Sequence, residues 1–258
     1  MKENIVAIIP ARGGSKRIKG KNIKKFKGDP AISSTIKKLK KSKIFSRILV
    51  STDSSKIMKI SKKAGADIPF ARPKNLSSDY VSDFSVITHC IKFLNYKNYK
   101  FNYVCYVYPV NPFLRISDLK KGLIKIKKRK TGFVFSAVKY QFPFFRSFIV
   151  SKKKIKMIFK EYYKKRSQDL KQIFCDAGQF YWGSKNTWLK EKMRFSKNSD
   201  IITIPKWRYH DIDTLDDWKK AEKITDIDLK WKKIIGKISK KNISAGTPFK
   251  KNFIWTVV

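Results

Sequence analysis

The segment from Pro10 to Asn22, PARGGSKRIKGKN, carries residue types that bind phosphate groups. Its glycine pair, Gly13 and Gly14, allows backbone amides to approach a phosphate closely, and the hydroxyl of Ser15 adds another donor. Arginine binds phosphate with two parallel hydrogen bonds, whereas lysine contributes a point charge. The side chains that would neutralise a triphosphate in this way are Arg12, Lys16 and Lys21.

The spacing within this segment excludes two common nucleotide sites. It has neither the GxxxxGK[ST] pattern of a P-loop nor the GxGxxG pattern of a dinucleotide fold. A basic glycine turn without a ligand is the alternative. Anion binding is favoured because arginine is scarce in this chain and the glycine pair directly follows an apolar run.

A second pattern is Asp211-Ile-Asp213, near the C-terminal end of the chain. On a strand, alternate residues project to one face, so these two carboxylates would converge and could hold a hard divalent cation. The alternative is helix capping and a solvated acidic face, and spacing alone leaves both open. Acidic residues are rare, yet seven of the 19 fall between Asp211 and Asp228.

The elements that must position these residues are visible as short apolar runs that alternate with helical periodicity. Strands are predicted at Asn4 to Pro10, Arg47 to Thr52, Tyr103 to Val107, Gly132 to Val138, Gln179 to Gly183 and Ile201 to Pro205. Helices are predicted at Ile32 to Leu39, Ser54 to Gly65, Ser82 to Leu94, Asp118 to Lys128 and Thr214 to Ile224. This order predicts a three-layer α/β fold with a mainly parallel sheet, which places the Pro10–Asn22 segment at the carboxyl edge where ligands bind.

The regular pattern is interrupted between residues 143 and 175, where aromatic residues and lysines mix without a period. We interpret this segment as an arm that leaves the sheet and contacts another subunit. Residues 1–225 are predicted to form one domain that includes the arm, and residues 226–258 a basic C-terminal tail of unknown role.

The composition bounds the class of protein. The 258 residues are 42% hydrophobic and 14% aromatic, which is enough for a buried core. Lys and Arg number 61 against 19 Asp and Glu, a net charge of +42. Such a charge suits a polyanion-binding protein, but lysines occur in nearly every segment, which favours a compositional bias over a nucleic-acid footprint.

Two further features concern the compartment. The cysteines, at positions 90, 105 and 175, are widely spaced and form no CxxC pair, so neither a disulfide framework nor a zinc site is indicated. The first apolar run is too short for a signal peptide, and no run reaches the length of a membrane span. We expect a soluble cytoplasmic protein without a membrane partner.

Several motifs, in the same order along the chain, resemble those of the CMP-sialic acid synthetases, or acylneuraminate cytidylyltransferases. They are IPARGGSKRIKGKN, VSTDS (Val50 to Ser54), Arg72-Pro73, RSQDL (Arg166 to Leu170), DAGQFYWG (Asp176 to Gly183) and DIDT (Asp211 to Thr214). Enzymes of this family transfer CMP from CTP to nine-carbon keto sugar acids. The DAGQFYWG, RSQDL and PFLR (Pro112 to Arg115) segments are most similar to the branch that acts on pseudaminic acid.

The resemblance implies a Rossmann-like nucleotidyltransferase architecture, CTP as co-substrate and Mg²⁺ as cofactor. The positions that it implies for the nucleotide are Arg12, Gly13, Gly14, Ser15, Lys16, Lys21, Asn22, Arg72 and Ser82. It implies that Asp211 and Asp213 bind the metal. The catalytic residues would be Arg12, Lys21 and Asp211.

The resemblance also implies a set of sugar-binding positions: Tyr108, Arg166, Gln168, Asp176 and Gln179. Tyr108 stands where sialic acid enzymes have glutamine, in agreement with a different sugar. Arg166 is a cation that would suit the substrate carboxylate, the alternative being one more exposed base in a basic arm.

The expected reaction is an in-line attack of the anomeric hydroxyl of pseudaminic acid on the α-phosphate of CTP, giving the CMP-sugar and pyrophosphate. The alternatives within the class are a CMP-N-acetylneuraminate or a CMP-legionaminate synthetase. From another class, the chain could be a nonenzymatic polyanion binder. The family resemblance implies a homodimer formed through the arm. We expect no nucleic-acid partner, because the lysines are spread over nearly every segment.

Overall fold

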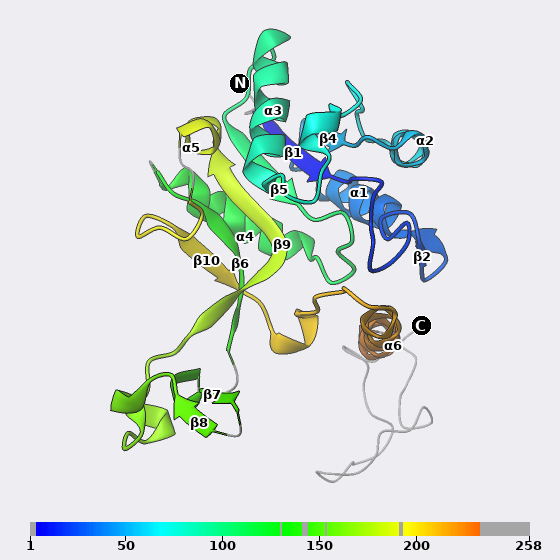
Figure 1. The fold of residues 1–258 in the computed structure, drawn as a ribbon. Helices are drawn as coiled ribbons and strands as arrows, with labels where there is room; N and C mark the ends of the chain where they lie inside the picture. The colour runs from blue at the N-terminus through cyan, green and yellow to red at the C-terminus, as the bar shows by residue number, and fades with distance from the viewer. Residues whose placement is uncertain (1–3, 130, 141–143, 153, 191–192, 233–258) are drawn as a thin grey trace, which may run out of the picture.

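A six-stranded sheet in the order β10-β6-β9-β5-β1-β4 forms the centre of the molecule (Figure 1). The computed structural model describes residues 4–129, 131–140, 144–152, 154–190 and 193–232. The strands of the sheet are β1 (Ile5–Pro10), β4 (Arg47–Ser51), β5 (Tyr103–Val107), β6 (Val134–Lys139), β9 (Phe174–Ser184) and β10 (Asp200–Thr203). β9 pairs antiparallel with both β5 and β6, whereas the other pairings are parallel. The prediction of a mainly parallel sheet is confirmed.

The apolar runs become strands because both faces of the sheet are covered. Alternate β1 side chains enter different cores: Ile5, Ala7 and Ile9 pack on one side, and Val6 and Ile8 on the other. A strand buried on both faces reads as a continuous apolar run, which is the pattern that the sequence shows.

Helices form the outer two layers, so the predicted three-layer fold is confirmed. α1 (Ala31–Ser42), α2 (Ser55–Ala64) and α4 (Ile116–Lys127) contribute side chains to the core that contains Ile5. α3 (Asp83–Tyr96) and α5 (Lys185–Lys190) contribute to the core that contains Val6. α6 (Leu215–Lys232) lies away from the centre of the sheet, near the β2 end of the molecule (Figure 1).

The ends of α2 follow from local sequence chemistry. The Ser54 hydroxyl accepts a hydrogen bond from the Ile57 amide at 3.4 Å, and Gly65 ends the helix with φ of 91°. A glycine adopts this left-handed conformation without the steric cost of a Cβ. Both ends were predicted from these residue types.

The arm between β6 and β9 projects from the body (Figure 1). It contains the antiparallel hairpin of β7 (Phe148–Ser151) and β8 (Lys154–Met157). β9 begins at Phe174, five residues before the predicted strand, so it carries the chain from the arm back into the sheet. The residues that complete the secondary structure are β2 (Lys25–Phe26), β3 (Asp29–Pro30) and the 3-10 helices at Lys74–Leu76, Phe144–Arg146, Lys160–Tyr162, Ser167–Asp169 and Lys206–Arg208.

The C-terminal helix is longer than predicted, because α6 continues without a break through Lys232. It therefore crosses the proposed boundary between the domain and the basic tail, and residues 233–258 of that tail lie outside the described residues. Among the described residues, no helix is both long and apolar enough to cross a membrane.

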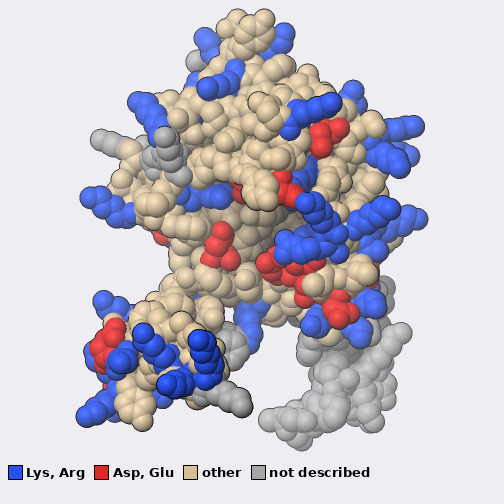
Figure 2. All heavy atoms as spheres, in the orientation of Figure 1, with Lys and Arg blue, Asp and Glu red and all other residues tan. Residues whose placement is uncertain are grey.

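Positive side chains are spread over the visible face of the molecule rather than confined to one element (Figure 2). They occur on the body and on the arm, while acidic residues are few. This distribution agrees with lysine as a general surface residue.

Candidate active site

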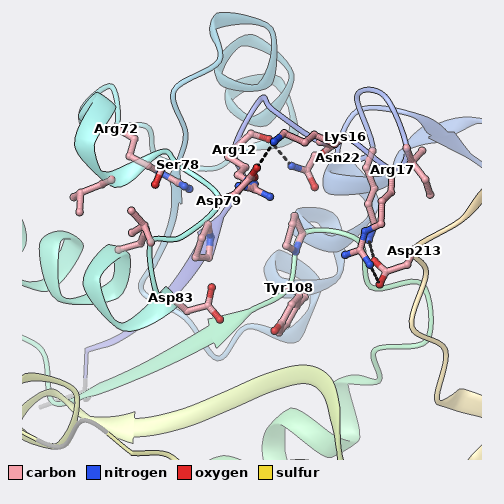
Figure 3. Close-up of a pocket in the computed structure, with 18 of the residues that line it drawn as sticks. Arg12, Lys16, Arg17, Asn22, Arg72, Ser78, Asp79, Asp83, Tyr108 and Asp213 are labelled. Carbon is pink, nitrogen blue, oxygen red and sulfur yellow. Dashed lines mark hydrogen bonds and ion pairs between the residues drawn. The ribbon is translucent and has the colours of Figure 1, made fainter. Parts of the chain in front are cut away.

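A cavity of about 310 Å³ opens beside the carboxyl ends of β1 and β5, at the edge predicted for a ligand (Figure 3). Its wall includes loop residues that follow β1 and residues that precede α3. Eight of the residues predicted for a site meet here: Arg12, Ser15, Lys16, Lys21, Asn22, Arg72, Tyr108 and Asp213.

The two glycines of the loop have different surroundings. A Cβ added at Gly13 would lie 3.0 Å from the Cβ of Ser54, so the loop packs tightly against the start of α2. The Gly13 amide donates to the Asp53 carboxylate at 2.8 Å. At Gly14 an added Cβ would meet no heavy atom within 4 Å, so this residue leaves open space for a ligand.

Asn22 holds the loop through a hydrogen bond to its backbone. It is buried, and its amide nitrogen donates to the Arg12 carbonyl at 3.0 Å. Because that contact joins the two ends of the loop, Asn22 positions the segment that carries the cations.

Four cations of the loop are held by two carboxylates. Arg12 and Lys16 both pair with Asp79, the latter at 2.6 Å. Arg17 and Lys21 pair with Asp213, at 2.5 and 3.3 Å.

These contacts lower the pKa of Asp79, chiefly through its hydrogen bond with Lys16. Like charges at this density repel unless an anion lies between them. The arrangement therefore favours bound anions.

A second cavity, of about 420 Å³, adjoins the first. Their walls share Arg17, Lys21, Asn22, Tyr108, Pro109 and Asp213. The second cavity is also lined by Asp176, Gly178, Tyr209, His210 and Asp211. Asp176 is oriented by a hydrogen bond that it accepts from the Tyr181 hydroxyl. Two ligands could thus lie end to end, with Lys21 and Tyr108 at their junction.

The prediction that Asp211 and Asp213 lie on a strand is wrong. The segment lies between the 3-10 helix Lys206–Arg208 and α6, and it has no strand partner. It is fixed instead by the buried side chain of Ile212 and by the Asp213 amide, which donates to Asp217 at 3.2 Å. The Asp-Ile-Asp pattern alone does not show whether the segment pairs with a neighbouring strand.

The two carboxylates nevertheless influence each other. The pKa of Asp211 is raised by partial desolvation and then by the negative charge of Asp213. A divalent cation would relieve that repulsion.

Among the described residues, no group of three or more His, Cys, Asp or Glu side chains could hold a metal. Mg²⁺ is commonly held by one or two carboxylates together with substrate phosphates, so this pair fits that ion.

Arg72 and Ser82, both predicted at the nucleotide, are placed differently. Arg72 is buried, donates to the Ser51 hydroxyl at 3.1 Å and to its carbonyl, and also lines the first cavity. Burial lowers its pKa. Ser82 caps α3 by accepting from the Ser85 amide at 3.2 Å, and it lines a separate cavity with Thr88.

Three of the predicted sugar-binding residues lie outside both cavities. Arg166 is on the arm, where it pairs with Asp169 at 2.7 Å, and Gln168 lines a cavity formed by arm residues and the adjoining end of β6. Gln179 is 4% exposed, and its side-chain amide donates to the Arg208 carbonyl at 3.0 Å. Its position in β9 makes it part of the support of the second cavity.

That support is a buried polar network that joins five segments: the 3-10 helix Lys206–Arg208, α4, the loop after β5, β9 and β6. The Arg208 guanidinium pairs with Asp118 at the start of α4, and both side chains are at most 10% exposed. The Asn111 side-chain amide donates to the backbone carbonyl of Gln179 at 2.8 Å, and the backbone amide of Gln179 donates to the Ser136 hydroxyl at 3.0 Å. The network fixes the chain just before Asp211. The spacing of these residues in the sequence did not predict this network.

Three further residues at the loop, Arg17, Asp53 and Asp79, were not among those predicted for the site. Arg17 is one of many basic residues in the sequence. Because arginine is much rarer than lysine in this chain, its presence in the loop could have indicated a role in the site. Asp53 lies in the VSTDS motif, directly after β4. Asp79 has no neighbouring pattern, so only the fold brings it to the loop.

The comparisons with known proteins agree with this geometry. A family model described as cytidylyltransferase matches residues 6–200. The chain belongs to the cytidylyltransferase family.

Among curated relatives of this cytidylyltransferase chain, the pseudaminic acid cytidylyltransferase of Campylobacter jejuni is 38% identical over 84% of the chain and 94% of the relative. The CMP-N,N'-diacetyllegionaminic acid synthase of Legionella pneumophila is 27% identical over 86% of the chain and 97% of the relative.

A solved structure of a CMP:2-keto-3-deoxy-manno-octonic acid synthetase complexed with CTP has the same fold. Its TM-score is 0.64 at 13% identity, over 88% of this chain and all of that chain. The nucleotidyltransferase architecture expected from the sequence is confirmed.

The buried Arg208–Asp118 pair yields a prediction for stability. Asp118→Asn removes the carboxylate that neutralises the buried Arg208 charge, which should lower the free energy of unfolding by about 3–5 kcal/mol in urea titrations. The matched control is Asp169→Asn, which removes the exposed partner of Arg166 and should cost no more than about 1 kcal/mol. Equal effects of the two substitutions would contradict a supporting role for the buried pair.

Proposed function

We propose that this enzyme transfers CMP from CTP to pseudaminic acid and releases pyrophosphate. The observation that carries the proposal is the 38% identity to a pseudaminic acid cytidylyltransferase over 94% of its length. The 27% identity to a legionaminic acid synthase is lower over a similar span. The two adjoining cavities support the proposal, because each would accommodate one of two substrates.

The first cavity suits the nucleotide. Arg12, Lys16 and Lys21, which line this cavity, would bind the triphosphate. Gly14 does not line the cavity, but an added Cβ would meet nothing there, so its backbone would be open to a phosphate. Arg72, held rigidly against Ser51, would contact the nucleoside part at the far wall. Ser82 would influence the nucleoside part only indirectly, because it caps and thereby positions the start of α3.

The second cavity suits the acceptor sugar. Asp176 and Tyr108 offer polar groups to its hydroxyls and amides, and Tyr181 orients the Asp176 carboxylate. Lys21 lies in the wall common to both cavities, so its charge would act at the α-phosphate. Gln179 would hold the cavity wall rather than touch the sugar.

The reaction joins the anomeric oxygen to the α-phosphorus as the bond to the pyrophosphate oxygen breaks. The hydroxyl proton is lost, and pyrophosphate leaves with the electron pair of the broken bond. In phosphoryl transfer, positioning and neutralisation of charge supply most of the catalysis, which is the work that Arg12 and Lys21 would perform.

We propose a cytoplasmic location, where CTP is made.

Asp211 and Asp213 would hold Mg²⁺ together with the phosphates. The ion would supply additional neutralisation of the negative charge on the triphosphate. To bind the ion, Asp213 would give up its contacts with Arg17 and Lys21. Both cations would then be available to phosphate oxygens.

Replacement of Asp211 tests the metal assignment. Asp211→Asn should lower kcat by about a hundredfold or more, the scale expected when an aligned electrostatic contact is lost. It should also weaken Mn²⁺ binding, followed by electron paramagnetic resonance in the presence of CTP. Asp216→Asn, which changes an exposed acid in the first turn of α6, is the control. Unchanged turnover and Mn²⁺ binding in Asp211→Asn would remove this residue from the metal site.

The arm is proposed to form a homodimer. The register of the hairpin places Phe148, Val150 and Ile155 on one face, where they are 56%, 64% and 70% exposed. A two-stranded hairpin with an uncovered apolar face gains stability when another surface packs on it. Arg166 and Gln168 would reach a sugar from the arm of a second copy.

Light scattering after size exclusion tests the dimer. Val150→Asp should convert a dimer to a monomer, because it places a charge within the apolar face. Ile149→Asp is the matched control, since this neighbour is 57% exposed on the opposite face and should leave the dimer intact. A monomeric unsubstituted protein, or equal disruption by both variants, would exclude this interface.

A panel of keto sugar acids tests the function itself. The protein is mixed with CTP, Mg²⁺ and pseudaminic, legionaminic or N-acetylneuraminic acid, and pyrophosphate release is measured. Pseudaminic acid should give the highest kcat/KM. A preference for another acid would assign the enzyme to that alternative. No release with any acid, together with tight nucleic-acid binding at physiological salt, would favour the nonenzymatic polyanion binder.

A further inference from the structure

Asp79 contacts the cations that the nucleotide would need. One carboxylate oxygen pairs with Arg12, and the other lies 2.6 Å from the Lys16 ammonium. Figure 3 shows Asp79 directed toward these two side chains across the cavity. A carboxylate that bridges two cations resembles a phosphate group that does so, because both present paired anionic oxygens.

The backbone around Asp79 allows this side chain to move. The residue lies between the 3-10 helix Lys74–Leu76 and α3, in a stretch without helix or strand. Its neighbours Ser78 and Tyr80 are exposed, and Tyr80 is 98% exposed. Among the described contacts of Ser78 to Tyr80, the hydrogen bonds and ion pairs are those of the Asp79 carboxylate.

A second acid at this wall, close to Asp79 in the sequence, is placed differently. Asp83 lines the same cavity, but its ion pair is with Arg194, at 3.5 Å, on the far side from the loop. Negative charge at the cavity wall therefore does not by itself occupy the loop cations. The contact with Arg12 and Lys16 is specific to Asp79, whereas Asp213, which also lines this cavity, pairs with Arg17 and Lys21.

We propose that Asp79 is an internal competitor of the CTP triphosphate: it holds Arg12 and Lys16 while the site is empty and gives way to phosphate oxygens when the nucleotide binds. The inference rests on the proposed function of the loop in binding CTP. In the empty enzyme, this contact keeps the two cations aimed into the cavity. It also lowers the affinity for weak anions, which cannot replace a carboxylate that is already present.

The exposure of the partners makes the exchange feasible. The Arg12 and Lys16 side chains are 36% and 82% exposed, so their pairs with Asp79 are screened by water. Exposed ion pairs contribute little net free energy. A triphosphate carries several negative charges and can contact both cations at once, so it outcompetes a single carboxylate.

The test is a binding titration by calorimetry, with CTP and separately with inorganic pyrophosphate. EDTA is present so that no divalent cation contributes, and the sugar is omitted. Asp79→Asn should bind both ligands about two- to fivefold more tightly than the unsubstituted protein, the scale of an exposed ion pair. The gain should be similar for pyrophosphate and CTP, because it arises at the phosphates.

Two controls match the charge change. Asp67→Asn removes the partner of Arg47 outside the cavity, and Asp83→Asn removes a carboxylate of the same cavity wall that does not touch the loop cations. Asp67→Asn should leave the dissociation constants unchanged, and Asp83→Asn should alter them less than Asp79→Asn.

Unchanged or weaker binding by Asp79→Asn would contradict the competition. So would an equal gain in Asp83→Asn, since the effect would then be general electrostatics. If the unsubstituted protein and Asp79→Asn both bind neither ligand, with EDTA and also with Mg²⁺ in its place, the phosphate site itself is refuted along with this inference. If the unsubstituted protein binds CTP and Asp79→Asn does not gain affinity, only the inference fails.

Discussion

Four positive side chains must stay close together on one short loop, and this constraint governs the site. Arg12, Lys16, Arg17 and Lys21 repel one another, and the empty protein places carboxylates of Asp79 and Asp213 between them. Each acid comes from a different part of the chain, one from the segment before α3 and one from the segment before α6. The charge of the loop therefore links the first strand to both of these segments. A triphosphate would complete the same arrangement with a stronger anion.

The fold supplies the rigidity that this arrangement needs. β1, buried on both faces, ends where the loop begins, so the first cation directly follows the core. The side chains of Asn22 and Asp53 fix the loop by hydrogen bonds to its backbone, and the Arg208–Asp118 pair fixes the segment that leads to Asp211. A reaction that depends on positioning gains from such support, because a misplaced charge stabilises the transition state poorly. The deep polar network and the exposed charge pairs thus have different roles, one in holding the site and the other in exchanging with ligands.

Much of the fold was predictable, because strands buried on both faces and amphipathic helices leave different periodicities in the sequence. The cation loop was also predictable, since its glycines follow an apolar strand. The context of Asp211 was not, because an acidic pair looks the same on a strand and in an extended connection. Gln179 belonged to a family motif, yet its side chain turns into the buried network rather than a cavity. Asp79 was invisible in the sequence, because an ion pair across more than 60 residues follows from the fold alone. The total charge of +42 was the least informative number, since the cations that matter are those the fold gathers.

The central claim is that the loop from Arg12 to Asn22 binds the triphosphate of CTP in place of Asp79. A crystal structure with CTP bound and no sugar present tests it most directly. The account predicts phosphate oxygens within hydrogen-bonding distance of Arg12 and Lys16, with Asp79 no longer paired to either cation. A triphosphate bound elsewhere, with the Asp79 contacts still in place, would contradict it.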